Sequence, residues 1–421
     1  EEIKAEYALA LTQVGATPEA IELFKKINYT SAPKGLLYHA IALFTQWDYA
    51  AATPLLYKYL QTPRLSDYEI LVGKVNLAAA YIDKQKYSEA EKLLENLLSV
   101  TKKNDFKLLY GNCLELSVQL ATNKKDYISA KKSLALANES LENGPQKYQL
   151  MVAKWQAITD FGASPKSKTN IKALANVKQK AIKMGHWETV RDCDFYQAYF
   201  TQDDALYLKV YFGTPQAAYR LRLKRLYKSN IELPENYSWN PTGEQRQKDH
   251  VIDAQMGKDL RSGATLKFDS NSYRLFLILA SDFYLPYRVE SLFSHLFPGE
   301  FYNPLTASGR VHSSAKRLQT WFNENSIPLK IRKQIGGYRL FFIRPYGIQV
   351  YLKYNFGVDM QFLSELKAKT STETGFTSND LVKLLDIPKR SLIRKINELL
   401  RLGVIKKGKG SGRSTRYFII G

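Results

Sequence analysis

Three clusters of cationic side chains in the second half of the sequence have the residue types and the spacing for contacts with phosphate groups. They lie in residues 309–318, 389–397 and 406–416. Arginine and lysine bind phosphate oxygens, arginine and asparagine also bind base edges, and serine hydroxyls contact phosphates. The candidate contacts are Arg310, Ser313, Ser314, Lys316, Arg317, Lys389, Arg390, Arg394, Asn397, Lys406, Lys407, Lys409, Arg413 and Arg416.

The distribution of charge also indicates a polyanionic partner. The 421 residues include 61 lysines and arginines and 40 aspartates and glutamates, which gives a formal net charge of +21. Residues 1–200 hold 26 basic and 21 acidic residues, whereas residues 201–421 hold 35 and 19. A basic region attracts nucleic acid and gains entropy when condensed counterions are released. Nucleic acid is therefore the expected partner, and an anionic membrane surface is the weaker alternative.

The other chemistry-bearing residues form no pattern that is typical of an enzyme or a metal site. Cys113 and Cys193 are 80 residues apart, and we expect both to pack in helices as small apolar side chains. The glycine-rich stretch 408–412 lacks the order of a phosphate-binding loop and precedes a strand pattern. The histidines, without metal-ligand spacing, are His39, His186, His250, His295 and His312. We predict no catalytic residues, no metal and no cofactor.

Composition and hydropathy indicate a folded protein without membrane spans. Hydrophobic residues make up 45% of the chain and aromatic residues 13%, which argues against wholesale disorder. The longest apolar runs, such as 275–280, are far shorter than a membrane span, and no signal-peptide pattern is present. The length predicts two to four domains. We expect a cytoplasmic location, because the unpaired cysteines suit a reducing compartment.

A pattern of small and aromatic residues recurs through residues 1–205. In its best copy Leu77, Ala78 and Tyr81 line one helix face, and Tyr87 and Ala90 follow a polar turn. The small residue belongs where two helices approach closely. The same frame returns at 15–24, 47–56 and 127–134, and in a poorer form at 185–190.

This pattern resembles the tetratricopeptide repeat, which implies an N-terminal α-solenoid with a concave surface for a peptide or protein partner. The resemblance suggests that Asn76 clamps a partner's backbone or carboxylate, and the alternative is an exposed polar residue on a helix. The repeats could also form a homodimer. Residues 206–249 then read as a basic helical connector that ends in a loop.

The sequence pattern of residues 250–345 predicts three helices followed by a hairpin. The expected helices are 273–281, 289–297 and 307–325, after a strand pair at 250–254 and 265–268 and before hairpin strands at 329–335 and 337–342. The stretches 296–300, 309–318 and 337–340 resemble the OmpR/PhoB-type winged-helix DNA-binding domain. With Val311, Ala315 and Leu318 directed inward, the resemblance implies that the third helix lies in a major groove.

The sequence pattern of residues 346–421 predicts a second domain with helices followed by a hairpin. Thr377 and Asp380 form a capping box, a turn follows at 386–388, and helix 389–402 buries Leu392, Ile396 and Leu399. Gly403 ends that helix, and a hairpin with a glycine-rich tip follows. The order of elements resembles the winged helix-turn-helix of MarR-like bacterial repressors.

Together these patterns predict a mainly α protein with an α-solenoid and two winged-helix (α+β) domains. The function that the resemblances imply is that of a bacterial-type transcription regulator that binds double-stranded DNA sequence-specifically. The alternative is a scaffold subunit of the PCI type, which also combines helical repeats with a winged helix. The second winged helix and the concentration of cations on the third helices and on one hairpin favour DNA.

Overall fold

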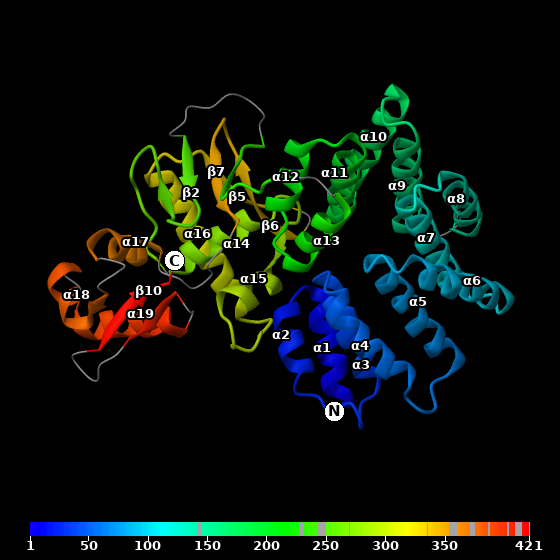
Figure 1. The fold of residues 1–421 in the computed structure, drawn as a ribbon, viewed down its shortest axis with the longest axis horizontal. Helices are drawn as coiled ribbons and strands as arrows, with labels where there is room; N and C mark the ends of the chain where they lie inside the picture. Colours follow the sequence, from blue (N-terminus) through cyan, green and yellow to red (C-terminus); the bar gives the residue numbers. More distant parts are fainter. Residues whose placement is uncertain are drawn as a thin grey trace. The chain divides into compact units, whose positions relative to one another are not determined.

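The computed structural model describes residues 1–141, 145–227, 231–241, 250–268, 270–334, 336–352, 360–370, 375–385, 388–401, 404–408 and 415–420. Several side chains in 360–401, that of Arg394 among them, lie outside this description. The chain is mainly helical with small sheets, as the sequence predicts (Figure 1). It divides into two compact units. The first unit comprises Glu1–Leu233, Ser281–Ser313 and Ile331–Leu340, and the second comprises Pro234–Ala280, Ser314–Lys330 and Phe341–Gly421.

Successive helices of the first unit pack against one another in chain order. They are α1 (Glu2–Val14), α2 (Thr17–Phe24), α3 (Lys34–Thr45), α4 (Tyr49–Leu60), α5 (Asp67–Asp83), α6 (Tyr87–Lys103), α7 (Lys107–Asn123), α8 (Tyr127–Leu141), α9 (Gln146–Ala163), α10 (Lys168–Met184), α11 (Trp187–Thr201), α12 (Asp204–Phe212) and α13 (Ala217–Tyr227). Alanines at the predicted close-approach positions have no exposed surface: Ala20, Ala52, Ala90 and Ala130. A larger side chain there would force the paired helices apart.

Among the described residues of α1–α13, six helix ends share one hydrogen-bonding pattern. After α5, for example, the N–H of Gln85 donates to the carbonyl of Ile82 (3.1 Å), and the N–H of Lys86 donates to that of Tyr81 (2.9 Å). This pair of bonds is a Schellman motif, which needs a left-handed residue just past the helix. The residues that supply it are Gly15, Trp47, Gln85, Asp105, Lys125 and Gly185. The recurrence explains why the chain reverses so regularly.

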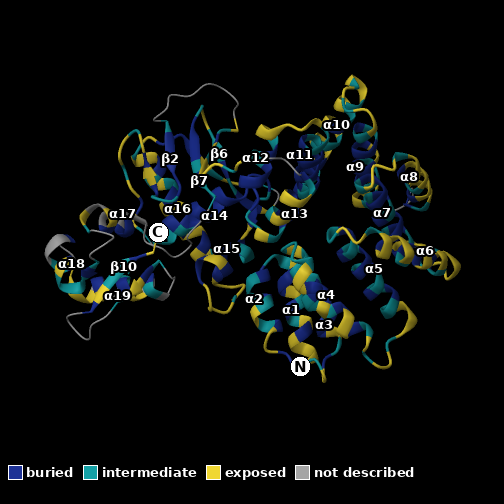
Figure 2. Cartoon of the chain, viewed as in Figure 1, coloured by how far each residue is buried: buried dark blue, intermediate teal, exposed yellow. Residues whose placement is uncertain are grey.

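Helices of the first unit alternate between broad and narrow buried faces (Figure 2). α7 buries residues on several sides, whereas α8 buries a single stripe at spacings of three and four residues. A narrow stripe indicates a helix that packs on one side and faces solvent on the other. The broadly buried helices are therefore the inner ones of each pair.

The basic stretch that the sequence predicts as a helical connector contains helix α13, which packs within the first unit. Tyr219 and Leu223 have no exposed surface, and Arg222 is 9% exposed. The Arg222 Nε lies 3.4 Å from Asp83 Oδ1, and its guanidinium lies 5.2 Å from the ring centroid of Trp47. The expected helix is present, and its cations have buried partners that lie far away in the sequence.

The second unit contains a four-stranded sheet. Its strands are β1 (Asn236–Trp239), β2 (Val251–Asp253), β3 (Lys258–Asp259) and β7 (Gly347–Tyr351), in the order β1-β7-β2-β3. β2 pairs in parallel with β7, and Ile252 lies opposite Ile348, both without exposed surface. The predicted strand 265–268 is reduced to a bridge between Lys258 and Thr265. β7, which the sequence analysis did not predict as a strand, is one of the two inner strands of this sheet.

Two segments repeat one order of elements: helix, short strand, helix, helix, hairpin. In the first helix–hairpin assembly these are α14 (Asn271–Ser281), β4 (Tyr287–Arg288), α15 (Val289–Leu296), α16 (Ala307–Glu324), β5 (Leu329–Gln334) and β6 (Gly337–Phe342). In the second assembly they are α17 (Met360–Lys369), β8 (Phe376–Thr377), α18 (Ser378–Leu385), α19 (Lys389–Arg401), β9 (Ile405–Lys407) and β10 (Arg416–Ile419). The short strand pairs with the last strand in both sheets, whose orders are β4-β6-β5 and β8-β10-β9.

Buried ion pairs attach the α14–β4 connection to α11. Nη2 of Arg191 lies 2.6 Å from Oδ2 of Asp282, and neither side chain is more than 1% exposed. The Tyr284 hydroxyl donates to Asp194 (2.8 Å), whose carboxylate also contacts Lys178 and Lys209. Burial alone would raise the pKa of Asp194, but the two lysines hold it below its usual value. The connection between α14 and β4 is thus held within the first unit by a buried ion pair and a hydrogen bond.

The second assembly has an apolar core made of its own residues. Phe362 and Leu366 of α17 pack with Leu392 and Ile396 of α19, and Ile419 of β10 completes the cluster. Each of these side chains is 9% exposed or less. This segment therefore buries a core that is local in sequence.

Cys113 and Cys193 are both buried in helices, as expected. Burial raises the pKa of each thiol to about 12, so both are neutral at physiological pH. Across the described segments, every helix is too short or too polar to cross a bilayer.

Candidate nucleic-acid interface

Helix α16 presents one apolar face and one polar face. Val311, Leu318 and Phe322 have no exposed surface, so the predicted inward face is correct. On the opposite side His312, Ser313, Lys316 and Arg317 are exposed. Of the predicted contacts on this helix, Ser313, Lys316 and Arg317 are therefore accessible to a partner.

Arg310 is accessible but already has an anionic partner. Its guanidinium forms a two-pronged ion pair with Glu300, with Nη2 3.0 Å from Oε1. The same group lies 3.7 Å from the ring centroid of Phe297. The hydrogen bond with Glu300 raises the pKa of Arg310 and lowers that of Glu300. A phosphate would have to compete with Glu300 for this guanidinium.

The structure corrects the placement of Ser314, which the sequence places on the outward face. Its side chain is 1% exposed. Position 314 lies three residues after Val311 and four before Leu318, which puts it on the buried side of the helix. Ser313 does face outward, and its hydroxyl donates to the carbonyl of Gly309 (2.8 Å). Ser314 is therefore withdrawn as a phosphate contact.

His312 was not singled out from the sequence, yet it joins α16 to the hairpin. The imidazole Nδ1 and the Tyr338 hydroxyl of β6 form a hydrogen bond. Their ring centroids lie 5.7 Å apart in an edge-on arrangement. This contact fixes the direction of β6 relative to the start of α16. No local sequence signal announces it, because the two residues are 26 positions apart.

The hairpin β5–β6 carries cations that the sequence analysis did not select. Lys330, Arg332 and Lys333 are exposed on β5. The signal was available, because two of these cations alternate with the less exposed Leu329 and Ile331. Gly337 opens β6 where a Cβ atom would lie 2.8 Å from Pro286. Only glycine allows that close approach between the hairpin and the segment before β4.

The second assembly begins its second helix with the predicted capping box. The N–H of Asp380 donates to the Thr377 hydroxyl (3.2 Å), and the N–H of Thr377 donates to Asp380 Oδ2 (2.9 Å). Both ends of the motif are present, so this prediction is confirmed. The box fixes the start of α18, which precedes the turn into α19.

Helix α19 buries Leu392, Ile396 and Leu399, as the sequence predicts. Its exposed side carries the predicted contacts Lys389, Arg390 and Asn397, together with Ile393, which is 42% exposed. Lys389 Nζ donates to the side chain of Asn379 (3.4 Å). The side chain of Arg394 lies outside the described part, so its predicted role stays a prediction.

The hairpin β9–β10 displays the remaining predicted cations at its base. Lys406, Lys407 and Arg416 are exposed, and Lys407 lies opposite Tyr417 in the antiparallel ladder. The N–H of Gly408 donates to the carbonyl of Arg416 (2.8 Å), which continues the pairing one step beyond the strands. Lys409 and Arg413 lie outside the described residues.

Asn76, the predicted partner contact, uses part of its amide within its own helix. Its Nδ2 donates to the carbonyl of Val72 (2.8 Å), and the side chain is half-buried. Both observations are expected for a polar residue on a helix that packs against its neighbours. A role in binding a partner stays a prediction.

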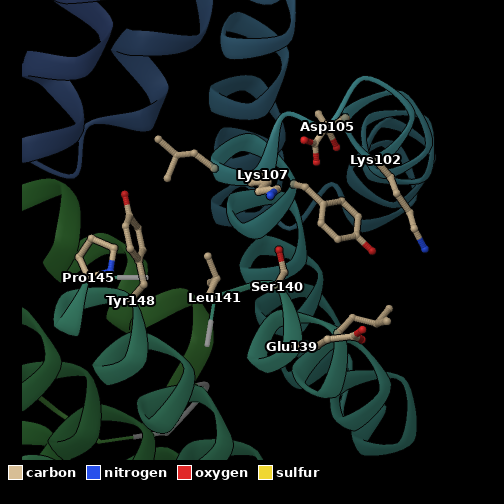
Figure 3. Close-up of a pocket in the computed structure, with 12 residues that line it drawn as sticks. Lys102, Asp105, Lys107, Glu139, Ser140, Leu141, Pro145 and Tyr148 are labelled. Carbon is tan, nitrogen blue, oxygen red and sulfur yellow. The ribbon is translucent and has the colours of Figure 1, made fainter. Parts of the chain in front are cut away.

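A groove of about 590 Å³ opens where α6 meets α7 and α8 meets α9 (Figure 3). Lysines and carboxylates both line it: Lys102 and Lys107, Asp105 and Glu139. Because the lining carries both positive and negative groups, it does not favour either an anionic or a cationic ligand. Within the part of the chain that the structure describes, no group of three histidine, cysteine, aspartate or glutamate side chains is placed to hold a metal ion.

Comparisons of the chain with protein-family models, with curated proteins and with solved structures found no match. The chemical interpretation of the interface therefore rests on its own geometry. Exposed cations lie on α16, on β5, on α19 and on the β9–β10 hairpin. Ser314 is buried and cannot contact a phosphate, and Arg310 is paired with Glu300.

Proposed function

We propose that this protein is a transcription regulator that binds double-stranded DNA sequence-specifically. In this proposal both helix–hairpin assemblies are winged-helix domains, with α16 and α19 as recognition helices and the hairpins as wings. The observation that carries the proposal is the repeated order of elements, with exposed cations on the last helix and on the hairpin each time.

The residue types on α19 and on the β9–β10 hairpin support this role. A major groove is about 12 Å wide and admits one α-helix. The exposed side of α19 offers lysine, arginine and asparagine, which are the side chains that read base edges and phosphates. Glycines flank the cations of the β9–β10 hairpin, so its backbone can follow a curved phosphate chain. The helix would therefore specify sequence, and the hairpin would position it.

We further propose that helices α1–α13 form a tetratricopeptide-like solenoid that receives the regulatory partner, a peptide or a protein, or that forms a homodimer in the cytoplasm. The repeated helix-pair turns and the alanines between paired helices support the solenoid. The near balance of charge in residues 1–200 fits a protein partner better than a nucleic acid.

A binding measurement on the full chain tests the DNA proposal. Fluorescence anisotropy with a labelled random duplex should show binding at low salt. The affinity should fall by about 10³–10⁵-fold between about 50 and 200 mM salt if about six to ten phosphates are contacted. Selection from a random duplex pool should then enrich one motif, and a palindrome would indicate a dimer.

A matched pair of double variants locates the contact. Lys406→Gln with Lys407→Gln should weaken binding and reduce the salt slope by about two, because two phosphate contacts are removed. Lys102→Gln with Lys103→Gln removes the same charge from an exposed end of α6 and should leave affinity close to wild type. Equal losses would show that only net charge matters. If the wild-type chain ignored every duplex at low salt, the scaffold alternative would replace this proposal.

A further inference from the structure

A cleft of about 900 Å³ opens within the first unit, at the ends of several helix pairs. The turns between α5 and α6 and between α7 and α8 supply one part of its wall, and α11 and α13 supply another. Its volume lies in the range of about 300–1,000 Å³ that is typical of sites for small molecules. The cleft is separate from the cationic helices and hairpins to which the proposed function assigns DNA.

Aromatic side chains make up nearly half of the lining residues. Tyr196 and Phe200 of α11 stack with ring centroids 5.9 Å apart and an interplanar angle of 29°. Tyr127 approaches Phe200 at 6.4 Å, and Tyr199 and Phe200 are only partly buried. Rings held in this way offer their faces and edges to another flat ring. An aromatic ligand is therefore favoured over an aliphatic or a sugar-like one.

The charged groups of the lining are positive. Among the described residues that line the cleft there is no carboxylate, whereas Lys124 and Lys125 are both present. Lys124 Nζ lies 2.9 Å from Glu91 and is paired. Lys125 Nζ instead lies 5.9 Å from the ring centroid of Tyr199, on the aromatic wall. Lys125 is therefore the cation best placed to meet an anionic group.

Amide groups complete the polar part of the cleft. The hydroxyl of Tyr196 donates to Oδ1 of Asn123 (3.1 Å), which fixes which end of this amide accepts. Gln85 and Gln202 also line the cleft. Lys125, Gln85 and Gln202 all have left-handed backbone conformations, with φ of 60°, 58° and 56°. The turns thus hold these residues in fixed positions at the edge of the cleft.

We propose that this cleft binds a small molecule that combines a flat aromatic ring system with one anionic group. The rings of α11 receive the aromatic part, and Lys125 receives the anion. The inference concerns a separate site and does not require the proposed DNA-binding function.

A matched pair of fluorescent probes tests both halves of the inference on the full chain. Anilinonaphthalene sulfonate is aromatic and anionic, and phenylnaphthylamine has the same rings without the sulfonate. The folded chain should bind the sulfonate saturably at one site, and more tightly than the neutral probe. The proposal is overturned if the sulfonate shows no saturable binding, or if the neutral probe binds equally well.

Substitutions assign the binding to this cleft. Lys125→Gln should weaken the binding of the sulfonate probe by about five- to tenfold, because one partly screened charge interaction is lost. The same variant should leave the neutral probe unchanged. Lys132→Gln removes an equally exposed lysine from α8, outside the lining, and should change neither affinity. Equal effects of the two lysine variants would contradict the assignment.

The aromatic half needs a variant that keeps the fold. Phe200→Leu retains an apolar side chain at a partly exposed position and should weaken both probes together. Near-ultraviolet circular dichroism of the remaining aromatic residues checks that the native packing survives. Wild-type affinity for both probes in a folded Phe200→Leu variant would place the binding elsewhere.

Discussion

The two helix–hairpin assemblies have the same order of elements but are stabilised in different ways. The first is held to the helical array through the buried pair of Arg191 and Asp282 and through Tyr284. The second has an apolar core that draws on residues 362–419. The comparison shows that one topology can depend on distant residues in one copy and on local ones in the other. It predicts that their stabilities can be changed separately.

The cations of the two assemblies also differ. Arg310, near the start of α16, is paired with Glu300. At the start of α19, Lys389 contacts the uncharged side-chain amide of Asn379, and Arg390 is exposed. If both assemblies bind DNA, the second should therefore contribute more to affinity.

The largest expected effect is a loss of stability in the first unit that leaves the second assembly unchanged. Asp282→Ala leaves the Arg191 guanidinium buried without its closest partner, which should lower the free energy of unfolding of the first unit by about 3 kcal/mol. Glu188, 3.4 Å from Arg191, offsets a part of the loss. Hydrogen–deuterium exchange should rise in α11 and stay unchanged in α18 and α19. A uniform rise would show that the second assembly is not independent.

The next effect compares α19 with α16, the two helices proposed to contact DNA. Lys389→Gln with Arg390→Gln should weaken duplex binding by about tenfold or more, because base or phosphate contacts are lost. Lys316→Gln with Arg317→Gln should weaken it by a smaller factor, since Arg310 of that helix is already paired. Anisotropy titrations at one salt concentration measure both. The reverse order would assign the dominant contact to α16.

A smaller effect should appear when Arg310 is released. Glu300→Gln removes the anionic partner and adds one net positive charge, so duplex affinity should rise by about two- to fivefold. Glu22→Gln breaks a comparable exposed pair with Lys25 on α2 and serves as the control. If both variants gained the same affinity, net charge alone would explain the change. An unchanged affinity for Glu300→Gln would remove Arg310 from the interface.

The smallest effect concerns pH. Burial, with a further contribution from Lys25, lowers the pKa of His39, whose Nδ1 forms a hydrogen bond with the Tyr29 hydroxyl oxygen (2.9 Å). The unfolded value is about 6.5, so the neutral ring stabilises the fold above that pH, and the contribution is lost as pH falls towards the lower folded value. The loss should be smaller than the effects of the substitutions above.

Calorimetry between about pH 7.5 and 5.5 measures this loss. The transition that includes α1–α4 should move to lower temperature on acidification, and His39→Phe should reduce the movement. Residues 360–421 contain no histidine, so the transition of the second assembly provides an internal reference. A pH dependence that survives in His39→Phe would assign the effect to other groups.

Periodicity in the sequence predicted α14, α15, α16, α18, α19 and both hairpins, because each depends on neighbouring residues, whereas α17 was not predicted. Val311, Leu318 and Leu392 are buried as their spacing indicates. The same spacing placed Ser314 on the buried face, but its polar side chain suggested the opposite. Here the position in the helix decided the outcome, and the residue type did not.

Contacts between distant residues could not be predicted from the sequence. Arg222 was expected on a basic connector, and its partner Asp83 lies far earlier in the chain. The parallel pairing of β2 with β7 likewise joins residues almost a hundred positions apart. Nothing in the local pattern of either segment identifies its partner. The same applies to Arg310, whose pair with Glu300 spans a loop.

The sheet orders β4-β6-β5 and β8-β10-β9 leave β5 and β9 with one neighbouring strand each. An edge strand can recruit a strand from another molecule, and lysines along it hinder such association. Lys330, Lys333, Lys406 and Lys407 lie on these edges. The charges that we propose for phosphate contact would thus also oppose aggregation, and variants that neutralise them need to be examined for self-association before any loss of affinity is interpreted.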